Sequence, residues 1–556
     1  MKFKDITDEK NLTHKDEETS IIDIAHISTL IHNLSQYGPG VSVADINGDL
    51  LDDVFIGGDK NKPGVFFIHN REKGFDKRKL VLDSIFEDRG ALFFDVDGDG
   101  DNDLYVVSGG SESRNNQWYQ DRLYINDGLG NFHKTTDALP EITSSGSCVV
   151  AADYDMDGDL DLFVGGRLKP WEYPFPPKSY LLENQNGKFK DVSYKLGSTD
   201  GEIGMVTSAL WTDINNDNRV DLIIAGEWMP LKTFLNVDQA FRDVSTDYGL
   251  DNSDGWWNSI NGCDLDNDGD IDYLVGNNGL NSFFKASGEE PVEIHAGDFD
   301  QDGSIDPIIT HYIEGESYIT HPRNIINTKI PGFQNRIKTF EKYGQTPFNK
   351  SFTSKELEEG VHLKSKVMES VILENLDGEA FRFHYLPNEV QISPVYGTQF
   401  HDFNNDHLTD ILLVGNSYAD ETITGYYDAS YGAVLINRGG FNWDIPRLNA
   451  INLIADGDKK ALAKIIIEDE YAFIITENNG FSQGLHFEQM NEGQYITLGM
   501  SDWYAIVNIN KNITKKVEFY YGNGYLSQNS RHYFINTSIS DLKIANYVGD
   551  LREILK

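Results

Sequence analysis

The chain has 556 residues, and 89 acidic residues against 47 lysines and arginines give it a formal net charge of −42 at pH 7. This balance argues against nucleic acid or an anionic membrane surface as the partner, because both need a basic protein surface. Hydrophobic residues make up 39% of the chain and aromatic residues 12%. That is too much apolar character for a disordered acidic chain, so we expect a large folded core.

The cysteines and the start of the chain bear on the compartment. Cys148 and Cys263 cannot build a disulfide framework, and each lies in an apolar stretch, so we interpret both as core residues. No apolar run approaches the ~20 residues of a membrane-spanning helix. The first ten residues, MKFKDITDEK, contain no apolar signal region. Two interpretations stay open at this point: a cytosolic protein, or a protein whose leader lies outside this sequence.

A short acidic pattern recurs seven times, with oxygen-bearing side chains at positions 1, 3, 5 and 9 of each loop and a backbone carbonyl available at position 7. The predicted ligands in the first four loops are Asp45, Asn47, Asp49, Leu51 and Asp53; Asp95, Asp97, Asp99, Asp101 and Asp103; Asp153, Asp155, Asp157, Asp159 and Asp161; and Asp213, Asn215, Asp217, Arg219 and Asp221. The predicted ligands in the last three loops are Asp264, Asp266, Asp268, Asp270 and Asp272; Asp298, Asp300, Asp302, Ser304 and Asp306; and Asp402, Asn404, Asp406, Leu408 and Asp410.

Short strands are predicted around each acidic loop. The apolar runs that follow the loops, as at 54–56 and 162–164, are typical of buried strands. A second phrase follows several of these runs and predicts two more strands joined by a glycine turn, as at 123–132 and 181–189. Four antiparallel strands repeated every ~50–60 residues indicate propeller blades. The predicted fold is therefore all-β: a β-propeller of seven or eight four-stranded blades.

The ends of the ring leave the number of blades open. Residues 3–7 match the last strand of a blade but stand at the start of the chain, so we expect them to complete the final blade. Segment 460–487 supplies three strands without an acidic loop, which makes an eighth blade an option. The short spacing between Asp264 and Asp298 leaves the fifth blade short of a strand, so seven blades stay an option as well.

Residues 314–370 interrupt the repeat. Phe333, Ile337 and Phe340 have helical spacing, and Thr353 with Glu356 forms the pattern of a capping box. We predict a helical insertion between two strands of the sixth blade. It is a basic element on an acidic chain, and it carries Arg323, Lys329, Arg336, Lys338, Lys342, Lys350 and Lys355.

Two domains are predicted. Residues 1–490 form the propeller with its insertion, and residues 491–556, which lack an acidic loop, form a small separate β domain. Within this second domain, the strand pattern at 515–521 and the glycines at 522 and 524 suggest a hairpin.

The acidic loops suit calcium. Ca²⁺ takes six to eight oxygen ligands, whereas Mg²⁺ tolerates a flexible cage of several carboxylates poorly. Clustered carboxylates repel one another unless a cation neutralises them. We therefore expect up to seven structural Ca²⁺ ions, each stabilising the turn between two strands of a blade. Sites of this kind fill where calcium is millimolar, which favours an extracellular or cell-surface location.

These loops resemble the FG-GAP/VCBS repeats of integrin α-chain propellers and of the cartilage acidic protein family. The segment from Glu518 to Gly522 and on through Arg531 is similar to the ASPIC/UnbV domain that follows such repeats. Residues 427–432 resemble a phrase of large bacterial surface proteins of this class. The resemblance implies secreted or surface proteins that bind or adhere, and it implies that the seven sets of loop residues are calcium ligands.

A binding face is predicted opposite the calcium loops. Strand direction alternates within a blade, so the loops between second and third strands and the connections between blades lie on that face. Aromatic residues and arginines gather there, a combination that suits a sugar or a protein hot spot. The predicted face comprises Arg114, Trp118, Tyr119, Arg122, Arg167, Trp171, Tyr173, Trp228, Trp256, Trp257, Tyr396 and Tyr427. The alternative is that these rings pack against one another or beneath the insertion.

Two functions are compatible with these features. The first is a binding or adhesion module that recognises a glycan or an extracellular protein. The alternative is a propeller enzyme acting on carbohydrate, such as a polysaccharide lyase or a sugar dehydratase. Its candidate acid–base residues are His295, His311, His321 and Tyr396, which form no recognisable constellation by their spacing. The binding module is the preferred hypothesis.

Overall fold

The computed structural model describes residues 2–18, 23–197, 201–421, 423–487, 493–509 and 513–555. Seven antiparallel blades follow one another around a ring, and the innermost strand of each blade contacts that of the next. The contact between β31 (Lys459–Ile467) and β2 (Val41–Ala44) closes the ring. The predicted β-propeller is confirmed, with seven blades among the described residues.

The first four blades have the expected order of strands. Blade one consists of β2, β3 (Asp53–Ile56), β4 (Gly64–Asn70) and β5 (Gly74–Leu80). Blade two consists of β6 (Asp88–Phe94), β7 (Asp103–Ser108), β8 (Arg122–Asn126) and β9 (Phe132–Lys134). Blade three consists of β10 (Ser145–Ala152), β11 (Asp161–Leu168), β12 (Tyr180–Asn184) and β13 (Phe189–Asp191). Blade four consists of β14 (Met205–Thr212), β15 (Asp221–Met229), β16 (Lys232–Val237) and β17 (Ala240–Asp243), with β18 (Gly255–Trp256) added beside β15.

The last three blades complete the ring. Blade five consists of β19 (Ser259–Cys263), β20 (Asp272–Gly276), β25 (Val371–Leu376) and β26 (Ala380–Tyr385). Blade six consists of β27 (Gly397–His401), β28 (Asp410–Val414), β29 (Ala433–Asn437) and β30 (Trp443–Asp444). Blade seven consists of β31, β32 (Glu470–Glu477), β33 (Gln483–Phe487) and β1 (Phe3–Asp5). The pairing of β1 with β33 confirms that the start of the chain closes the ring.

The core lies between successive blades. The second strand of each blade is apolar on both faces because a neighbouring blade covers each face. In β7, Leu104 and Val106 pack toward blade one, while Tyr105 packs toward blade three. At the contact between blades one and two, the Phe55 and Phe93 ring centroids lie 6.4 Å apart. The sequences of these second strands are therefore short continuous apolar runs rather than alternating apolar and polar residues.

The insertion is larger than predicted and interrupts a different blade. It begins after β20 and returns at β25, so it interrupts blade five rather than blade six. It forms its own sheet in the order β23 (Glu316–Ile319), β22 (Asp306–Ile313), β21 (Val292–Gly297) and β24 (Val361–Ser365), and the Asp298 loop joins β21 to β22. The prediction that this loop belongs to a blade is wrong. A repeat of loop and strand sequence cannot show whether its strands join the ring or pair with one another.

One layer of short helices covers the inserted sheet, whose outer strands are β23 (Glu316–Ile319) and β24 (Val361–Ser365). The helices are α2 (Arg323–Lys329), α3 (Phe333–Arg336), α4 (Phe340–Gly344), η3 (Phe348–Lys350) and α5 (Ser354–Glu358). The predicted capping box is present at Thr353 and Glu356. Phe333 and Ile337 are buried, whereas Phe340 is exposed because a break after α3 ends the helical stripe. The remaining helices are α1 (Asp23–His26), α6 (Leu448–Ile451), η1 (Asn116–Tyr119), η2 (Ser193–Leu196) and η4 (Asn388–Val390).

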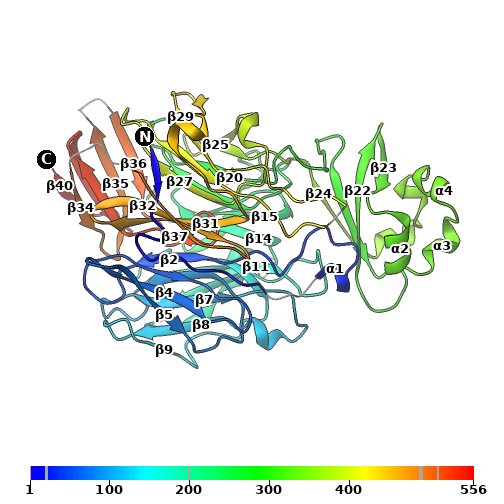
Figure 1. Cartoon of the computed structure of the whole chain (residues 1–556), viewed down its shortest axis with the longest axis horizontal. Helices are drawn as coiled ribbons and strands as arrows, with labels where there is room; N and C mark the ends of the chain where they lie inside the picture. The colour runs from blue at the N-terminus through cyan, green and yellow to red at the C-terminus, as the bar shows by residue number, and fades with distance from the viewer. Residues whose placement is uncertain are drawn as a thin grey trace.

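The C-terminal part lies at the end of the molecule opposite the insertion (Figure 1). It contains β34 (Gly493–Thr497) paired with β38 (His532–Asn536), and a sheet of β36 (Ile513–Glu518), β35 (Asp502–Ile509), β39 (Ile539–Asn546) and β40 (Leu551–Leu555). The predicted domain boundary at 490–491 lies outside the described residues. The predicted hairpin after 521 is absent from the described residues, because the chain leaves β36 and enters the centre of the propeller.

Residues 519–531, which we call the axial segment, bond to the innermost strand of every blade. In blades one and two, β37 (Ser527–Gln528) pairs in parallel with β2, and the Gln528 side chain bonds both the N–H and the carbonyl of Phe93. In blades three to five, the axial segment forms hydrogen bonds with the Ala151 N–H, the Ser208 hydroxyl and the Ile260 carbonyl. In blades six and seven, the Gln399 side chain and the Lys464 backbone complete the ring of contacts.

Close approach of the backbone requires glycine in the axial segment. Gly522 has φ +84°, and a Cβ there would lie 2.6 Å from the carbonyl oxygen of Val149. The left-handed conformation and the close contact both exclude a larger residue at this position. The C-terminal part is therefore not a separate neighbour of the propeller, because its chain fills the propeller axis.

Among the described residues, the structure contains no helix that is long and apolar enough to span a bilayer.

Replacing Gln528 with alanine is expected to destabilise the whole propeller. The change leaves the Phe93 N–H and carbonyl without their side-chain partner in a buried setting, which costs ~1–3 kcal/mol for each group. We expect a clear fall in the midpoint of urea unfolding. Gln494→Ala, at an exposed position on β34, is the control and should leave the midpoint unchanged. Equal midpoints for both variants would contradict the role of the axial segment.

Candidate functional site

Six of the seven acidic loops lie on one face of the ring, where each joins the first and second strands of a blade. The seventh, at Asp298, joins the equivalent strands of the inserted sheet. In every case the position-9 aspartate is the first residue of the second strand, as with Asp53 and Asp103. The repeat therefore fixes where the chain turns, and it gathers six sets of carboxylates on a single face.

Backbone hydrogen bonds shape each loop around its first and last aspartates, and loop two is representative. Asp95 accepts hydrogen bonds from the N–H groups of Gly98 (2.7 Å) and Gly100 (3.0 Å). Both glycines have positive φ, which permits the tight turn. Asp103 accepts from the N–H of Val96 at 2.9 Å, so the ninth residue is tied back to the second. These bonds aim the remaining carboxylates toward a common centre.

The loop carboxylates lie close enough to share one cation. In loops two, three and five, three carboxylate oxygens lie within 4.8 Å of one another. Burial, reinforced by the charges of the other loop aspartates, raises the pKa of Asp103 to about 7, of Asp272 to about 8 and of Asp161 to about 9. An ion-free loop therefore retains protons near neutral pH. A bound divalent cation would offset the cost of burying several charged carboxylates together.

In blades two to six, an asparagine at the end of the third strand links the acidic loop of its own blade to that of the preceding blade, a role that was not predicted from the sequence. In blade three, the Asn184 N–H donates to Asp161 at 2.8 Å, while its side chain donates to the Val96 carbonyl in the loop of blade two. The corresponding residues in other blades are Asn126, Asn236, Asn375 and Asn437. The signal was present in the sequence, because an asparagine recurs in the phrase that precedes the glycine turn.

Asp52 lies beside the position-9 aspartate of loop one but points elsewhere. Its carboxylate accepts from the Ile466 N–H of blade seven at 2.8 Å and lies 3.1 Å from Nδ1 of His532. It therefore joins the first blade, the last blade and the C-terminal part at the closure of the ring. Burial lowers the pKa of His532, but the hydrogen bond and charge of Asp52 outweigh this effect and raise it overall.

Lysines from other parts of the chain enter two of the loops. Lys516 of β36 places its Nζ 3.1 Å from Asp213 and 2.7 Å from the side-chain oxygen of Asn216 in loop four. Lys329 of α2 places its Nζ 2.9 Å from Asp306 and 2.8 Å from the Ser304 hydroxyl in loop six. A positive charge from the protein thus already lies beside the ligand oxygens of these two loops.

The predicted open face of aromatic residues is largely closed. Only Arg114, Trp118 and Trp171 retain appreciable exposure. The other nine residues are buried: Tyr119, Arg122, Arg167, Tyr173, Trp228, Trp256, Trp257, Tyr396 and Tyr427. The physical reason is that residues 27–34 and the inserted sheet cover this face, forming one apolar cluster with several of these rings. The alternative interpretation, rings packed beneath the insertion, is correct for Tyr173, Trp228 and Trp256. Trp257 instead packs in the core between blades four and five, and Tyr396 packs against Tyr525 of the axial segment.

Several of the buried residues form a polar network instead of a surface. Glu227 forms an ion pair with Arg167, accepts a hydrogen bond from the Tyr173 hydroxyl and lies 3.3 Å from Nε2 of His32. Burial alone would raise the pKa of Glu227, but the charges of Arg167 and His32 lower it well below its usual range. The network thus pairs these charges within the fold.

A cleft of about 740 Å³ remains on this side of the molecule, between blade three and the inserted sheet. Arg114, Trp171 and Lys169 line one side, and Gly303 and Ile305 of the Asp298 loop line the other. The Arg114 guanidinium lies 4.8 Å from the centre of the indole ring, and the indole N–H donates to the Ser111 carbonyl at 2.9 Å. Trp118 lies outside the cleft, beside Phe86 and Lys60.

The four candidate acid–base residues each have a separate setting. His311 contacts the Thr320 hydroxyl at 2.9 Å, and His321 is buried. Tyr396 lies beneath the ammonium of Lys460, 3.9 Å from the ring centre. His295 stacks on His362 in the inserted sheet. These separate partners, all within the described part of the chain, do not assemble the four candidates into an acid–base constellation.

Comparison with protein families identifies part of the repeat. The FG-GAP-like repeat profile matches residues 95–164 and 213–275, which include acidic loops two to five. The chain contains FG-GAP-like repeats. A comparison with curated proteins found no match. The resemblance of the C-terminal part to the ASPIC/UnbV domain stays a prediction.

Three solved structures similar to this chain have about one-tenth sequence identity to it. A crystal structure of BBS1N in complex with ARL6DN matches with 10% identity and a TM-score of 0.36, covering 83% of this chain and 94% of that chain. Sqt1 of Saccharomyces cerevisiae matches with 10% identity and a TM-score of 0.33, covering 83% and 100%. Sqt1 of Chaetomium thermophilum matches with 11% identity and a TM-score of 0.37, covering 82% and 97%.

The stability of the ion-free protein is expected to fall as the pH rises. The position-9 aspartates have folded-state pKa values of about 7 to 9 in loops two, three and five, above the unfolded value of ~3.9. The folded state therefore binds more protons between these values, and its stability decreases as they are lost. With a chelator present, the melting temperature should drop between pH 6 and 8. A melting temperature that rises over this range would contradict the assigned protonation.

Proposed function

We propose that this protein is a calcium-stabilised binding module that works outside the cell or on its surface and recognises a glycan through the cleft between blade three and the inserted sheet. The cleft is the observation that carries the proposal. Its volume of about 740 Å³ falls in the range of ~300–1,000 Å³ that is typical of small-ligand sites.

The chemistry of the cleft favours a saccharide. Its lining combines charged side chains, including Lys169 and Glu202, with the polar groups of Asn116, Thr143 and Ser144. Such groups pair with the many hydroxyls of a sugar, whereas a protein partner usually needs a broad surface with a central apolar anchor. The contact between Arg114 and Trp171 holds a planar cation at the rim. A protein ligand is the competing outcome of the binding test.

Calcium in the acidic loops supports this function indirectly. Each ring loop leads directly into a second strand, and five of the six ring loops are tied to the next blade through the asparagine link. Cations in these loops would therefore hold the blades, and the loops on the opposite face, in fixed positions. We expect calcium to bind most tightly in loops one, two, three, five and seven. Loops four and six already contact Lys516 and Lys329.

The outside location follows from the same loops. Loops of this kind bind calcium with modest affinity and fill at the millimolar concentrations found outside cells. Two unpaired cysteines among the described residues, Cys148 and Cys263, place no constraint on the compartment. The location is thus a consequence of the calcium proposal and is tested together with it.

Calcium should stabilise the protein, and Lys329→Gln should add one site. Binding at 100 times the dissociation constant contributes ~2.7 kcal/mol per site, so chelation should lower the melting temperature markedly. Removing the ammonium beside Asp306 should strengthen loop six by about tenfold, or ~1.4 kcal/mol. Equilibrium dialysis at limiting calcium would then show one more bound ion. Lys338→Gln, an exposed change in the same helical layer, is the control. A melt unaffected by chelation would refute the calcium proposal.

The cleft is tested by removing two of the three basic side chains that line it, Arg114 and Lys169. The double variant Arg114→Ala/Lys169→Ala should lose at least tenfold in affinity for the saccharide that a glycan array selects for the unaltered protein. Lys188→Ala is the matched control, because this lysine is exposed in a turn on the acidic-loop face. Unchanged binding by the double variant would place the ligand elsewhere. Selection of a protein, with no glycan bound, would replace the saccharide with a protein ligand.

A further inference from the structure

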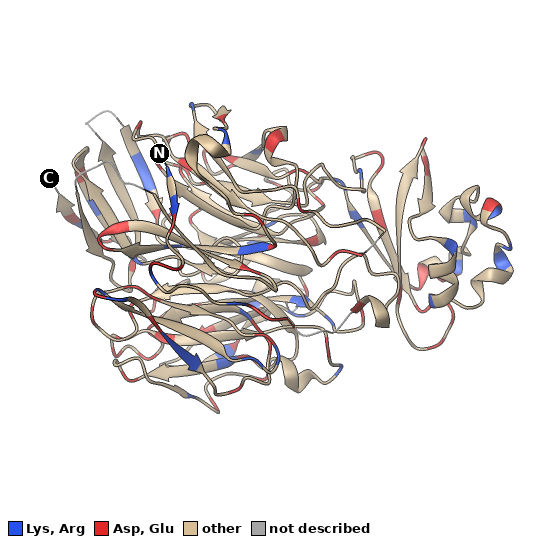
Figure 2. Ribbon diagram, viewed as in Figure 1, with Lys and Arg blue, Asp and Glu red and all other residues tan. Residues whose placement is uncertain are grey.

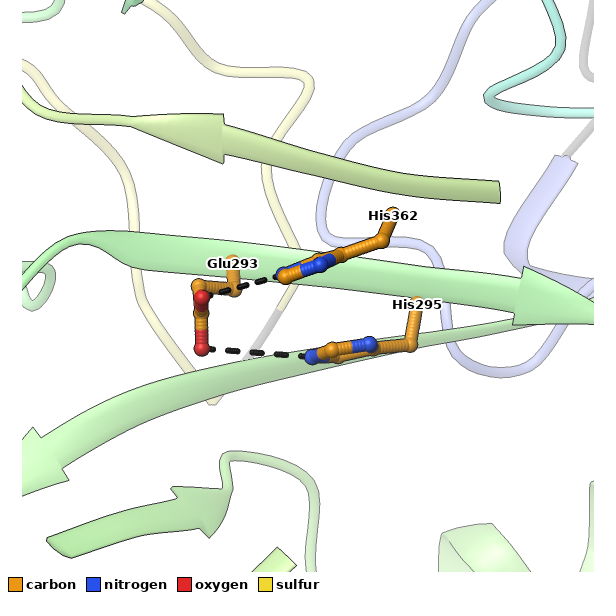
Figure 3. A group of neighbouring side chains, drawn as sticks. All are labelled: Glu293, His295 and His362. Carbon is orange, nitrogen blue, oxygen red and sulfur yellow. Dashed lines mark hydrogen bonds and ion pairs between the residues drawn. The ribbon is translucent and has the colours of Figure 1, made fainter. Parts of the chain in front are cut away.

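Two histidines and a glutamate come together on the inserted sheet (Figure 3). Glu293 and His295 are two residues apart on β21, so their side chains leave the same face of the sheet. His362 of β24 lies directly opposite His295 in the antiparallel register. Strand pairing between residues that are far apart in the sequence therefore creates the cluster, and the acidic loops take no part in it.

The two imidazole rings lie parallel and direct a nitrogen toward the same carboxylate (Figure 3). Their centroids are 4.1 Å apart with an interplanar angle of 15°. Nε2 of His362 lies 3.0 Å from one Glu293 oxygen, and Nε2 of His295 lies 3.9 Å from the other. The second distance exceeds hydrogen-bond length, and Nε2 of His295 is a buried atom with no hydrogen-bond partner. This ring nitrogen thus faces the centre of the cluster without a hydrogen-bond partner.

The cluster is closed on one side and open on the other. The Glu293 side chain is 8% exposed and that of His295 is 12% exposed, whereas that of His362 is 41% exposed. Phe348 of η3 stacks on His295 with centroids 4.1 Å apart and shields it from the helical side. His362 lies on β24, which has a partner strand on one side only, so solvent reaches the cluster from its free edge.

We infer that Glu293, His295 and His362 bind a divalent transition metal of the zinc class and leave a further coordination position open to solvent. Two imidazole nitrogens and a carboxylate oxygen are a recognised ligand set for zinc. The ligand atoms lie within 4.8 Å of one another. Bonds of ~2.0–2.2 Å to a common metal would bring them to roughly 3.4 Å apart, which needs only a modest closing of the cluster.

Within the described residues, the other histidine–glutamate contacts, including His32 with Glu227, each join a carboxylate to a single imidazole. His384 lies 2.6 Å from Glu374, and His486 contacts Glu470. Each of those carboxylates meets one imidazole, which a simple ion pair or hydrogen bond explains. Glu293 meets two imidazoles, one of which has an unpartnered nitrogen. Nitrogen ligands also select transition metals over calcium, so this site and the acidic loops would take different ions.

Lys364 offers a further handle on the site. Its Nζ lies 3.5 Å from the Glu293 oxygen that also contacts His362. An ammonium at this distance competes electrostatically with a metal for the carboxylate. The site as built would therefore bind its metal less tightly than the three ligands alone allow. Three protein ligands with one solvent-facing position are the arrangement of zinc sites that bind and polarise water, rather than of closed structural sites.

The test uses the full chain with its acidic loops saturated by calcium. Cobalt(II) serves as the probe because its visible absorption reports nitrogen ligands, and zinc is then added as a competitor. We expect one cobalt ion per chain, displaced by zinc. His362→Ala and Glu293→Gln should each weaken cobalt binding at least tenfold, and Lys364→Gln should strengthen it. Melting curves in calcium establish that each variant is folded.

His384→Ala on β26 is the matched control, because it removes a histidine from a single histidine–glutamate contact. This variant should bind cobalt as the unaltered protein does. Absence of cobalt or zinc binding up to millimolar metal would overturn the proposal. Undiminished binding by folded His362→Ala would overturn it as well, since the half-exposed ligand can be removed without disturbing the core. Neither result depends on the glycan proposal, so the two proposals succeed or fail separately.

Discussion

The structure depends on filling the axis of a seven-bladed ring. The innermost strands of the blades present one free edge each to the axis, and their N–H and carbonyl groups need partners there. The axial segment supplies these partners from the chain itself. Ser527 and Gln528 continue the sheet of blade one, while polar side chains of the segment or of the blades complete the other contacts. Ring and C-terminal part therefore stabilise each other.

Electrostatics impose the second constraint. The chain places 25 aspartates at positions 1, 3, 5 and 9 of its seven loops, and six of these loops share one face. Figure 2 shows acidic residues spread across the propeller, with lysines and arginines on the short helices of the insertion. Lysines of the chain itself offset part of this repulsion, as Lys516 does in loop four. The turns thus hold 25 of the 89 acidic residues of the chain.

The insertion gives the molecule features that a simple ring would lack. Its sheet helps to bury Tyr173, Trp228 and Trp256 of the predicted open face, and it forms one wall of the remaining cleft through Gly303 and Ile305. Its helical layer fixes His295 by contact with Phe348. Of the seven basic residues in this layer, Arg336 is paired with Glu356 and Lys329 with Asp306. The layer is therefore first a structural cover, and its exposed lysines are a secondary feature.

Sequence by itself determined the repeating unit, because carboxylates at fixed spacing and apolar runs are local properties of the chain. The acidic loops, most blade strands, the closing role of residues 3–5 and the capping box at Thr353 could all be predicted in this way. Only the tertiary structure decided that the Asp298 loop leaves the ring, that residues 519–531 fill the axis and that nine of twelve face residues are buried. It also brought His362 to Glu293 and His295. These outcomes depend on which strands pair across long stretches of sequence, and the spacing of residues along one strand carries no information about its partner.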